Sequence, residues 1–225
     1  SVTLNILRSQ FGRWDKTPPC NPLTNSKFAV YMTLQTLNWL KAKTPKTTTG
    51  QNNKMAIFHL NTSTISRKSG RTSTAAAAYR CGGILYDERT DKTHDYSKKK
   101  GVVFSECFIF ENNKKIILDR ERVWNTAEKV EKRIDARTAR EIIINLPYEL
   151  DEINRTELVQ EFTEHIAKTY NVAIDFAIHE PSKDGDQRNH HAHILMTTRR
   201  AELGENNSLV LGEKTNLELS NTKLG

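Results

Sequence analysis

The 225-residue sequence lacks several features that would assign it at once to a broad class of protein. Its three cysteines, Cys20, Cys81 and Cys107, lie far apart and form no C-x-x-C pair. This pattern argues against a disulfide framework and favours a reducing, cytoplasmic compartment. The sequence also has no run of 18 apolar residues, so we expect no helix that inserts into a membrane.

Most of the chain has no net positive charge, although the formal net charge of the whole is +7. Residues 1–54 carry eight Lys and Arg against a single acid, Asp15, so this segment accounts for the whole excess and residues 55–225 are neutral. Bulk charge therefore does not mark the main body as a nucleic-acid-binding protein. A local excess remains around the run Lys98, Lys99 and Lys100, which is either a solvated loop or a phosphate contact.

The composition divides the chain near residue 54. Residues 41–54 are polar and rich in threonine, with Pro and Gly among them, which is typical of a linker. We expect residues 1–54 to form a basic leader and linker outside the main fold, although a basic arm that acts with the main domain is the alternative. Residues 55–225 then form one domain, which we expect to be the N-terminal part of a longer protein.

Apolar patterning in the main body alternates between strand and helix. We predict helices over residues 73–81, 120–140 and 152–170. We predict strands over residues 55–60, 102–110, 141–146, 172–179 and 190–197. Residues 180–189 are too few for a crossover, so the last two strands should form an antiparallel hairpin. This order favours an α+β sandwich with an antiparallel sheet.

Three histidines on the last two strands carry the strongest chemical signal. Side chains alternate along a strand, so His191 and His193 share one face, while His190 points to the other. The apolar residues of 172–179 occupy the core face and leave His179 on the opposite one, and the hairpin brings His179 beside His191. Three neutral imidazoles suit Mn, Zn, Ni or Fe, and Mg less well by ligand softness alone. The alternative is three unrelated histidines.

An open three-histidine metal site would polarise a phosphoryl oxygen and orient the group for in-line attack, which requires a nucleophile. Tyr79 is the candidate, because it lies on the alanine-rich helix after a stretch of basic residues that suit a nearby phosphate. From the residues alone, a packing role for Tyr79 is the more common case. The basic residues around it are Arg67, Lys68, Arg71 and Arg80.

The H-x-H strand, the upstream third histidine and the early tyrosine resemble the HUH endonucleases. Several segments in the same order are similar to the MobA/MobL family of plasmid relaxases and to TraA-type conjugative relaxases. They are MAIFHL, the stretch ending AAAAYR, AEKVEKRIDARTAREIIINLPYEL, and FAIHE followed by NHHAHILMTTR. The family's N-P-H-x-H pattern is N-H-H-x-H here, with His190 where proline is common.

The resemblance implies an HUH, Rep-like α+β sandwich, in which helices flank a central antiparallel sheet. It maps the nucleophile onto Tyr79 and the metal ligands onto His179, His191 and His193, and we expect Mg or Mn as the divalent ion. It implies nicking of single-stranded DNA at a plasmid origin of transfer in the bacterial cytoplasm. Accessory relaxosome proteins and a coupling protein are the further partners that it suggests.

Glu141 falls where the family carries an acidic residue near the site. It would orient a ligand histidine or accept the tyrosine proton, and a solvated glutamate at the strand edge is the alternative. Asp175 is a weaker candidate on the same face as His179. We expect Arg67, Lys68, Arg71 and Arg80 to contact DNA.

Three other functions stay open. A rolling-circle replication initiator has the same fold, but its tyrosine normally follows the H-x-H strand, and no tyrosine follows Tyr170 here. A three-histidine metal hydrolase would need no tyrosine, so its activity would survive Tyr79→Phe. A non-catalytic DNA-binding module would bind origin DNA without metal and form no covalent adduct.

Overall fold

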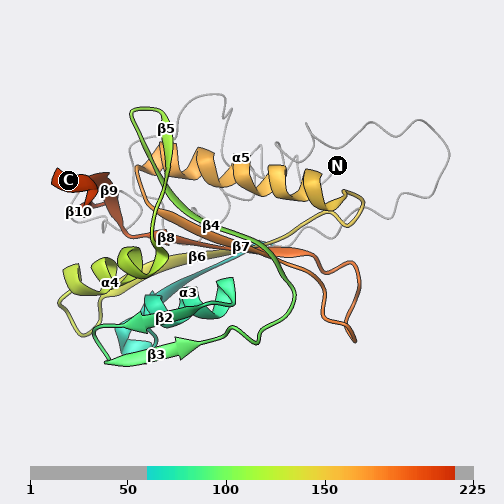
Figure 1. Cartoon of the computed structure of the whole chain (residues 1–225), viewed down its shortest axis with the longest axis horizontal. Helices are drawn as coiled ribbons and strands as arrows, with labels where there is room; N and C mark the ends of the chain where they lie inside the picture. The colour runs from blue at the N-terminus through green and yellow to red at the C-terminus, as the bar shows by residue number, and fades with distance from the viewer. Residues whose placement is uncertain (1–59, 216–225) are drawn as a thin grey trace, which may run out of the picture.

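The computed structural model describes residues 60–215, and its centre is a six-stranded sheet in the order β1-β6-β8-β7-β4-β5 (Figure 1). Every neighbouring pair in this sheet is antiparallel. The strands are β1 (Leu60–Ser66), β4 (Val102–Glu111), β5 (Lys114–Ile117), β6 (Arg137–Asn145), β7 (Ile174–His179) and β8 (His191–Thr197). The predicted leader, and all of the strand expected over 55–60 except Leu60, lie outside the described residues.

Helices cover both faces of the sheet, which makes the fold the predicted α+β sandwich. In Figure 1, α5 lies on one side, and α3 and α4 lie on the other. Within residues 60–215, no helix is long and apolar enough to cross a membrane. The helices are α3 (Ser73–Cys81), α4 (Arg120–Val130) and α5 (Glu152–Tyr170), with short 3-10 turns η1 (Arg67–Ser69) and η2 (Glu205–Asn207). Two hairpins complete the fold, β2 (Ile84–Asp87) with β3 (Lys92–Asp95) and β9 (Arg199–Leu203) with β10 (Leu209–Lys214).

The sheet separates two apolar cores. Under α5, Leu158, Phe162 and Ile166 pack with the apolar residues of the central strands, among them Phe176. The helical spacing of these α5 residues is the pattern from which we predicted the helix, and its bounds agree with the prediction. On the other face, the alanines of α3 and the buried Trp124 of α4 form the second core. Both faces of β7 are therefore buried.

The predicted helix over residues 120–140 is wrong in its last part. Helix α4 ends at Val130, and the next residue, Glu131, has extended backbone angles. Ile134, which fits the helical spacing, is 86% exposed. The strand β6 begins at Arg137 and pairs with β1 on one side and β8 on the other. Ladder hydrogen bonds to two strands outweigh the local helical pattern, because helix propensity is a weak preference that tertiary contacts override.

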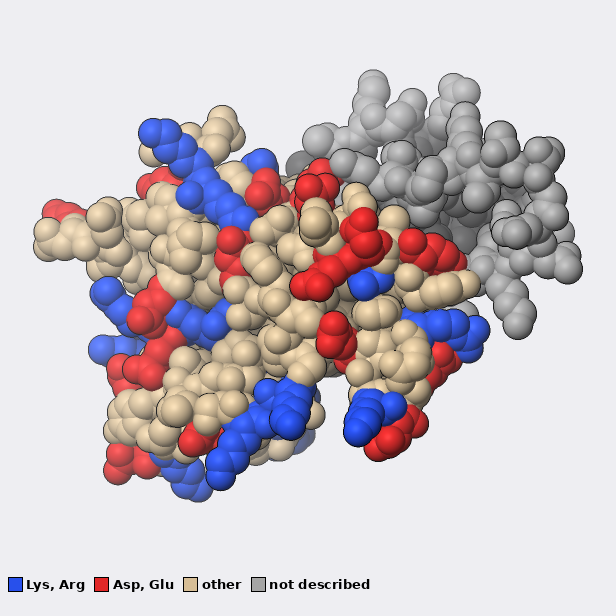
Figure 2. Space-filling view, turned by 45° about the vertical axis from the view of Figure 1, so that its right-hand side comes forward, with Lys and Arg blue, Asp and Glu red and all other residues tan. Residues whose placement is uncertain are grey.

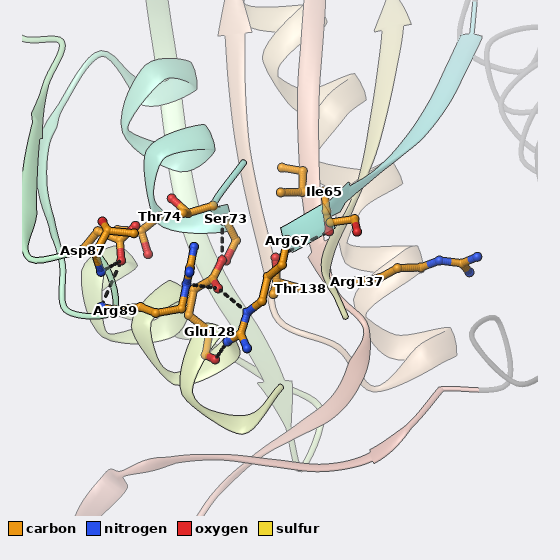
Figure 3. Close-up of polar contacts among 12 residues, drawn as sticks. Ile65, Arg67, Ser73, Thr74, Asp87, Arg89, Glu128, Arg137 and Thr138 are labelled. Atoms are coloured by element: carbon orange, nitrogen blue, oxygen red, sulfur yellow. Dashed lines mark hydrogen bonds and ion pairs between the residues drawn. The ribbon is translucent and has the colours of Figure 1, made fainter. Parts of the chain in front are cut away.

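A buried carboxylate of α4 anchors the start of α3 (Figure 3). Glu128 is 1% exposed, and its Oε1 accepts hydrogen bonds from the backbone N of Ser73 at 2.7 Å and from its Oγ at 2.8 Å. Its Oε2 accepts from Nε of Arg67 at 3.3 Å and from Nε of Arg89 at 3.1 Å. The side chain of Thr72 caps the same helix by accepting from the N of Ala75 at 3.0 Å. Negative charge at a helix N-terminus also interacts favourably with the helix dipole.

Glu128→Ala should lower the free energy of unfolding by about 3 kcal/mol, because the buried donors of Ser73 and Arg67 lose their acceptor. Urea denaturation followed by circular dichroism measures this change. Glu149→Ala removes an exposed carboxylate and should shift the free energy by no more than about 0.5 kcal/mol. A loss in Glu128→Ala as small as that of the control would contradict the anchoring role.

Candidate active site

Three histidines come together at one end of the two central strands. The pairing of β7 with β8 sets His179 opposite His191, and His193 lies opposite Ala177. One ring nitrogen from each histidine lies within 4.8 Å of those from the other two. The ring centroids are 4.9 to 5.3 Å apart. The predicted proximity is confirmed, and His190 does not belong to this cluster.

Each imidazole of the cluster is fixed by one of its own nitrogens. Nε2 of His179 contacts the carbonyl oxygen of Arg80 at 2.7 Å, and Nδ1 of His191 contacts that of Asn189 at 2.9 Å. Nδ1 of His193 lies 3.0 Å from a carboxylate oxygen of Glu141. These oxygens can only accept, so each contacting nitrogen carries the proton. The second nitrogen of every ring is left as a lone-pair donor, the arrangement typical of metal-ligating histidines.

The environment favours the neutral form of His179 and His191. Burial is the main cause that lowers the pKa of His179 to about 4, and it lowers the pKa of His191 as well. The hydrogen bond to the Arg80 carbonyl opposes this effect at His179 but does not cancel it. Neutral imidazole is the form that binds metal ions, so the site is suited to a cation at neutral pH.

Glu141 links the histidines to the tyrosine helix. It is 3% exposed, and its Oε1 accepts from Nδ1 of His193 and from Nε of Arg80 at 2.5 Å. Its Oε2 accepts from Oγ of Ser63 on β1 at 3.2 Å. Burial opposes the charged form of Glu141, but the hydrogen bonds from His193 and Arg80 outweigh it and lower the pKa to about 2. The carboxylate is therefore ionised and has a partner on both oxygens, unlike a solvated strand-edge glutamate.

Tyr79 lies near the end of α3, one residue before the carbonyl that contacts His179. Its side chain is 47% exposed and meets the ring of Tyr96 edge to face, with 5.2 Å between ring centroids. Nζ of Lys99 lies 3.7 Å from the centroid of the Tyr79 ring. The helix ends at Cys81 and is capped by Gly82, whose φ of 66° is the left-handed conformation that favours glycine. The tyrosine is thus accessible, and the residue that follows it contacts the histidine cluster.

The basic residues expected to contact DNA divide into two kinds. Arg67 and Arg80 are tied to buried carboxylates, Glu128 and Glu141 respectively. Lys68 and Arg71 are exposed. The surface in Figure 2 shows Lys and Arg interspersed with Asp and Glu, consistent with the neutral sequence of the main body. Contact with DNA stays a prediction for all four residues.

Asp175 does not contact the histidines. It is buried and accepts from Nε1 of Trp124 at 2.7 Å and from Nε of Arg120 at 2.8 Å, so it holds α4 on the sheet. The sequence analysis did not single out Tyr96 or Lys99 as site residues, although both pack on Tyr79. The run of three lysines was the only signal for Lys99, and it did not distinguish among its members.

A family model described as the MobA/MobL family matches residues 71–222, a range that includes Tyr79, Glu141 and the three histidines. The chain belongs to the MobA/MobL family. A mobilization protein MobL of Acidithiobacillus ferridurans is 40% identical over 164 residues, which are 64% of this chain and 43% of the relative. A conjugal transfer protein TraA of Rhizobium radiobacter is 35% identical over 173 residues, which are 71% of this chain and 15% of the relative.

A probable mobilization protein MobA of Bifidobacterium longum is 32% identical over 148 residues, 66% of this chain and 26% of that protein. The chain therefore spans less than half the length of each of these three relatives. Its fold is similar to a solved structure described as "Molecular Basis of Vancomycin Resistance Transfer in Staphylococcus aureus", with a TM-score of 0.59 and 32% identity. That similarity covers 71% of this chain and 78% of the other.

Glu141→Gln should weaken divalent-metal binding about 10- to 100-fold, because an amide oxygen holds the His193 ring less strongly than a carboxylate does. Calorimetric titration with Mn²⁺ measures this affinity. Glu128→Gln is a matched control, since Glu128 is equally buried and bonded to arginine but contacts none of the three histidines. Equal Mn²⁺ affinities in the two variants would contradict the orienting role of Glu141.

Proposed function

We propose that this domain nicks and rejoins single-stranded DNA at a plasmid origin of transfer through a 5′-phosphotyrosyl link to Tyr79. The observation that carries this proposal is the contact between the His179 ring and the carbonyl of Arg80. It joins the residue that follows Tyr79 to the histidine cluster, so a nucleophile and a candidate metal centre share one site. The relatives named as mobilization and conjugal transfer proteins support the same activity.

The three histidines fit a divalent ion, because their rings converge, and in each ring one nitrogen is hydrogen-bonded to an oxygen and the other keeps its lone pair. His179, His191 and His193 would hold the ion, which would act as a Lewis acid on a phosphoryl oxygen when bound. Mg and Mn are the ions that we expect, and Mn is the better match to three imidazole nitrogens.

Tyr79 supplies the nucleophile. Its phenol oxygen forms a bond to phosphorus as the bond from phosphorus to the 3′ oxygen breaks. The phenol loses its proton and the departing 3′ oxygen takes one up, which leaves a free 3′-hydroxyl and a 5′-phosphotyrosyl link. Because the phosphodiester is exchanged rather than hydrolysed, the reverse step reseals the strand with no external energy source.

The role of Glu141 follows from its surroundings. Both of its oxygens accept hydrogen bonds, and its pKa of about 2 makes it a weak base at neutral pH. This supports a positioning role, in which Glu141 orients His193 and holds Arg80 at the end of α3. It argues against Glu141 as the acceptor of the tyrosine proton.

Tyr79→Phe should abolish the covalent DNA–protein adduct that the wild-type protein forms with origin-containing single-stranded DNA and Mg²⁺ or Mn²⁺. Only the hydroxyl is lost, so the melting temperature should be retained. A denaturing gel detects the adduct, and peptide mapping by mass spectrometry locates it. Tyr86→Phe is the matched control, because Tyr86 is also exposed, at 40%.

Three outcomes would favour another function. DNA attached at Tyr86 or Tyr96 would replace Tyr79 as the nucleophile. Strand cleavage that survives Tyr79→Phe would indicate a three-histidine hydrolase. Cleavage of a plasmid replication origin in preference to an origin of transfer would indicate a rolling-circle initiator.

His191→Ala should abolish stoichiometric binding of Mn²⁺ in calorimetry and stop adduct formation, while binding of origin DNA largely persists. His190→Ala should leave both metal binding and adduct formation intact, since His190 precedes the cluster without belonging to it. A chelator added to the wild-type protein should reproduce the loss of the adduct. An unchanged binding isotherm for His191→Ala would remove this residue from the ligand set.

A further inference from the structure

Lys99 is placed against the candidate nucleophile by two separate contacts. Its Nζ lies over the face of the Tyr79 ring, 3.7 Å from the centroid, and donates a hydrogen bond to the carbonyl oxygen of the same residue at 2.7 Å. Lys99 belongs to the connection between β3 and β4, where its backbone N donates to the carbonyl of Tyr96 at 2.9 Å. Tyr96, whose ring packs on Tyr79, and Lys99, whose ammonium lies over the Tyr79 ring, thus belong to the same turn.

Lys99 differs from the neighbouring arginine in lacking an anionic partner. Arg80 is bonded to Glu141, whereas no carboxylate forms an ion pair with Lys99 anywhere in residues 60–215. The lysine is only partly exposed, and burial followed by the charge of Arg80 lowers its pKa. A partly desolvated cation costs free energy unless an opposite charge approaches it. In the protein without bound DNA, an anion that approached Tyr79 would therefore stabilise the ammonium group of Lys99.

We propose that Lys99 binds a non-bridging oxygen of the phosphate that Tyr79 attacks. This inference rests on the nicking function proposed above. An ammonium carries three donors, of which the Tyr79 carbonyl uses one, so others are available to the phosphate. Negative charge on the phosphoryl oxygens grows as the new bond forms, so this contact strengthens in the transition state. Lys99 keeps its proton throughout and transfers no group.

The two lysines next to Lys99 in the sequence, Lys98 and Lys100, differ from it in exposure and in their contacts. Lys98 and Lys100 are exposed, and neither has a contact with Tyr79 within residues 60–215. They supply two control positions of the same residue type. Any loss that comes only from lower positive charge near the site would appear in all three variants, whereas a direct phosphate contact belongs to Lys99 alone.

The test compares Lys99→Met with Lys98→Met and Lys100→Met in single-turnover adduct formation at saturating origin DNA and Mn²⁺. Lys99→Met should slow the reaction about 10²-fold or more, the loss that removal of one oxyanion donor causes. Lys99→Arg should restore part of the rate, and both control variants should react like the wild type. Mn²⁺ affinity should be unchanged in all of them.

A second readout separates phosphate contact from a structural role. Sulfur is placed at either non-bridging position of the scissile phosphate, and the rate penalty is measured for each diastereomer. For one diastereomer the penalty should be smaller in Lys99→Met than in the wild type, because the contact that sulfur weakens is already lost. If Lys99→Met melts below the assay temperature, Lys99→Gln takes its place with the same expectations, since it keeps a donor for the Tyr79 carbonyl without the charge.

Two results would overturn the role of Lys99 and leave the nicking function standing. One is a wild-type protein that forms the Tyr79 adduct while Lys99→Met reacts equally fast. The other is a slow Lys99→Met variant whose sulfur penalties equal those of the wild type for both diastereomers. A wild-type protein that forms no adduct would instead remove the proposed function, and the role of Lys99 with it.

Discussion

At the centre of the sheet, β7 and β8 pair in a register that sets His179 opposite His191. A slip of one residue would turn every side chain of the moved strand to the other face. Such a slip would remove Ile174, Phe176 and Ile178 from the core under α5, so burial of this apolar set fixes the register. The geometry of the histidine cluster is therefore a consequence of core packing.

Buried contacts hold helix α3 at both of its ends. Glu128 anchors the first turn through the backbone of Ser73, and His179 and Glu141 hold the last turn through Arg80. A helix of nine residues has little stability of its own, so these buried contacts and its alanine face determine where it lies. The position of Tyr79 is set by the same groups that orient the histidines. In the proposed reaction, preorganisation of this kind would reduce the entropy cost of ordering Tyr79 against the phosphate.

The histidine cluster could be predicted from the sequence because it depends on local rules, the alternation along two strands and a short connection between them. The bounds of α3 and α5 likewise follow from alanine content and helical spacing. The end of α4 could not be predicted in this way. Arg137 pairs with β1, and Ala139 and Arg140 pair with both β1 and β8, partners far away in the sequence. No local pattern carries that information, so the helical spacing misled the prediction.

The same limit explains why the basic residues looked equivalent in the sequence. Arg67 and Arg80 each bind a carboxylate 61 positions away, and the local sequence around the arginines does not predict these ion pairs. These two arginines hold the scaffold together, whereas Lys99 lies beside Tyr79 and forms no ion pair with a carboxylate of residues 60–215. A nearly neutral domain can therefore still present positive charge at one point. The carboxylates of Glu128 and Glu141 pair with Arg67 and Arg80, and neither pairs with Lys99. In the proposed reaction, Lys99 is therefore the cation beside Tyr79 that an arriving phosphate would stabilise.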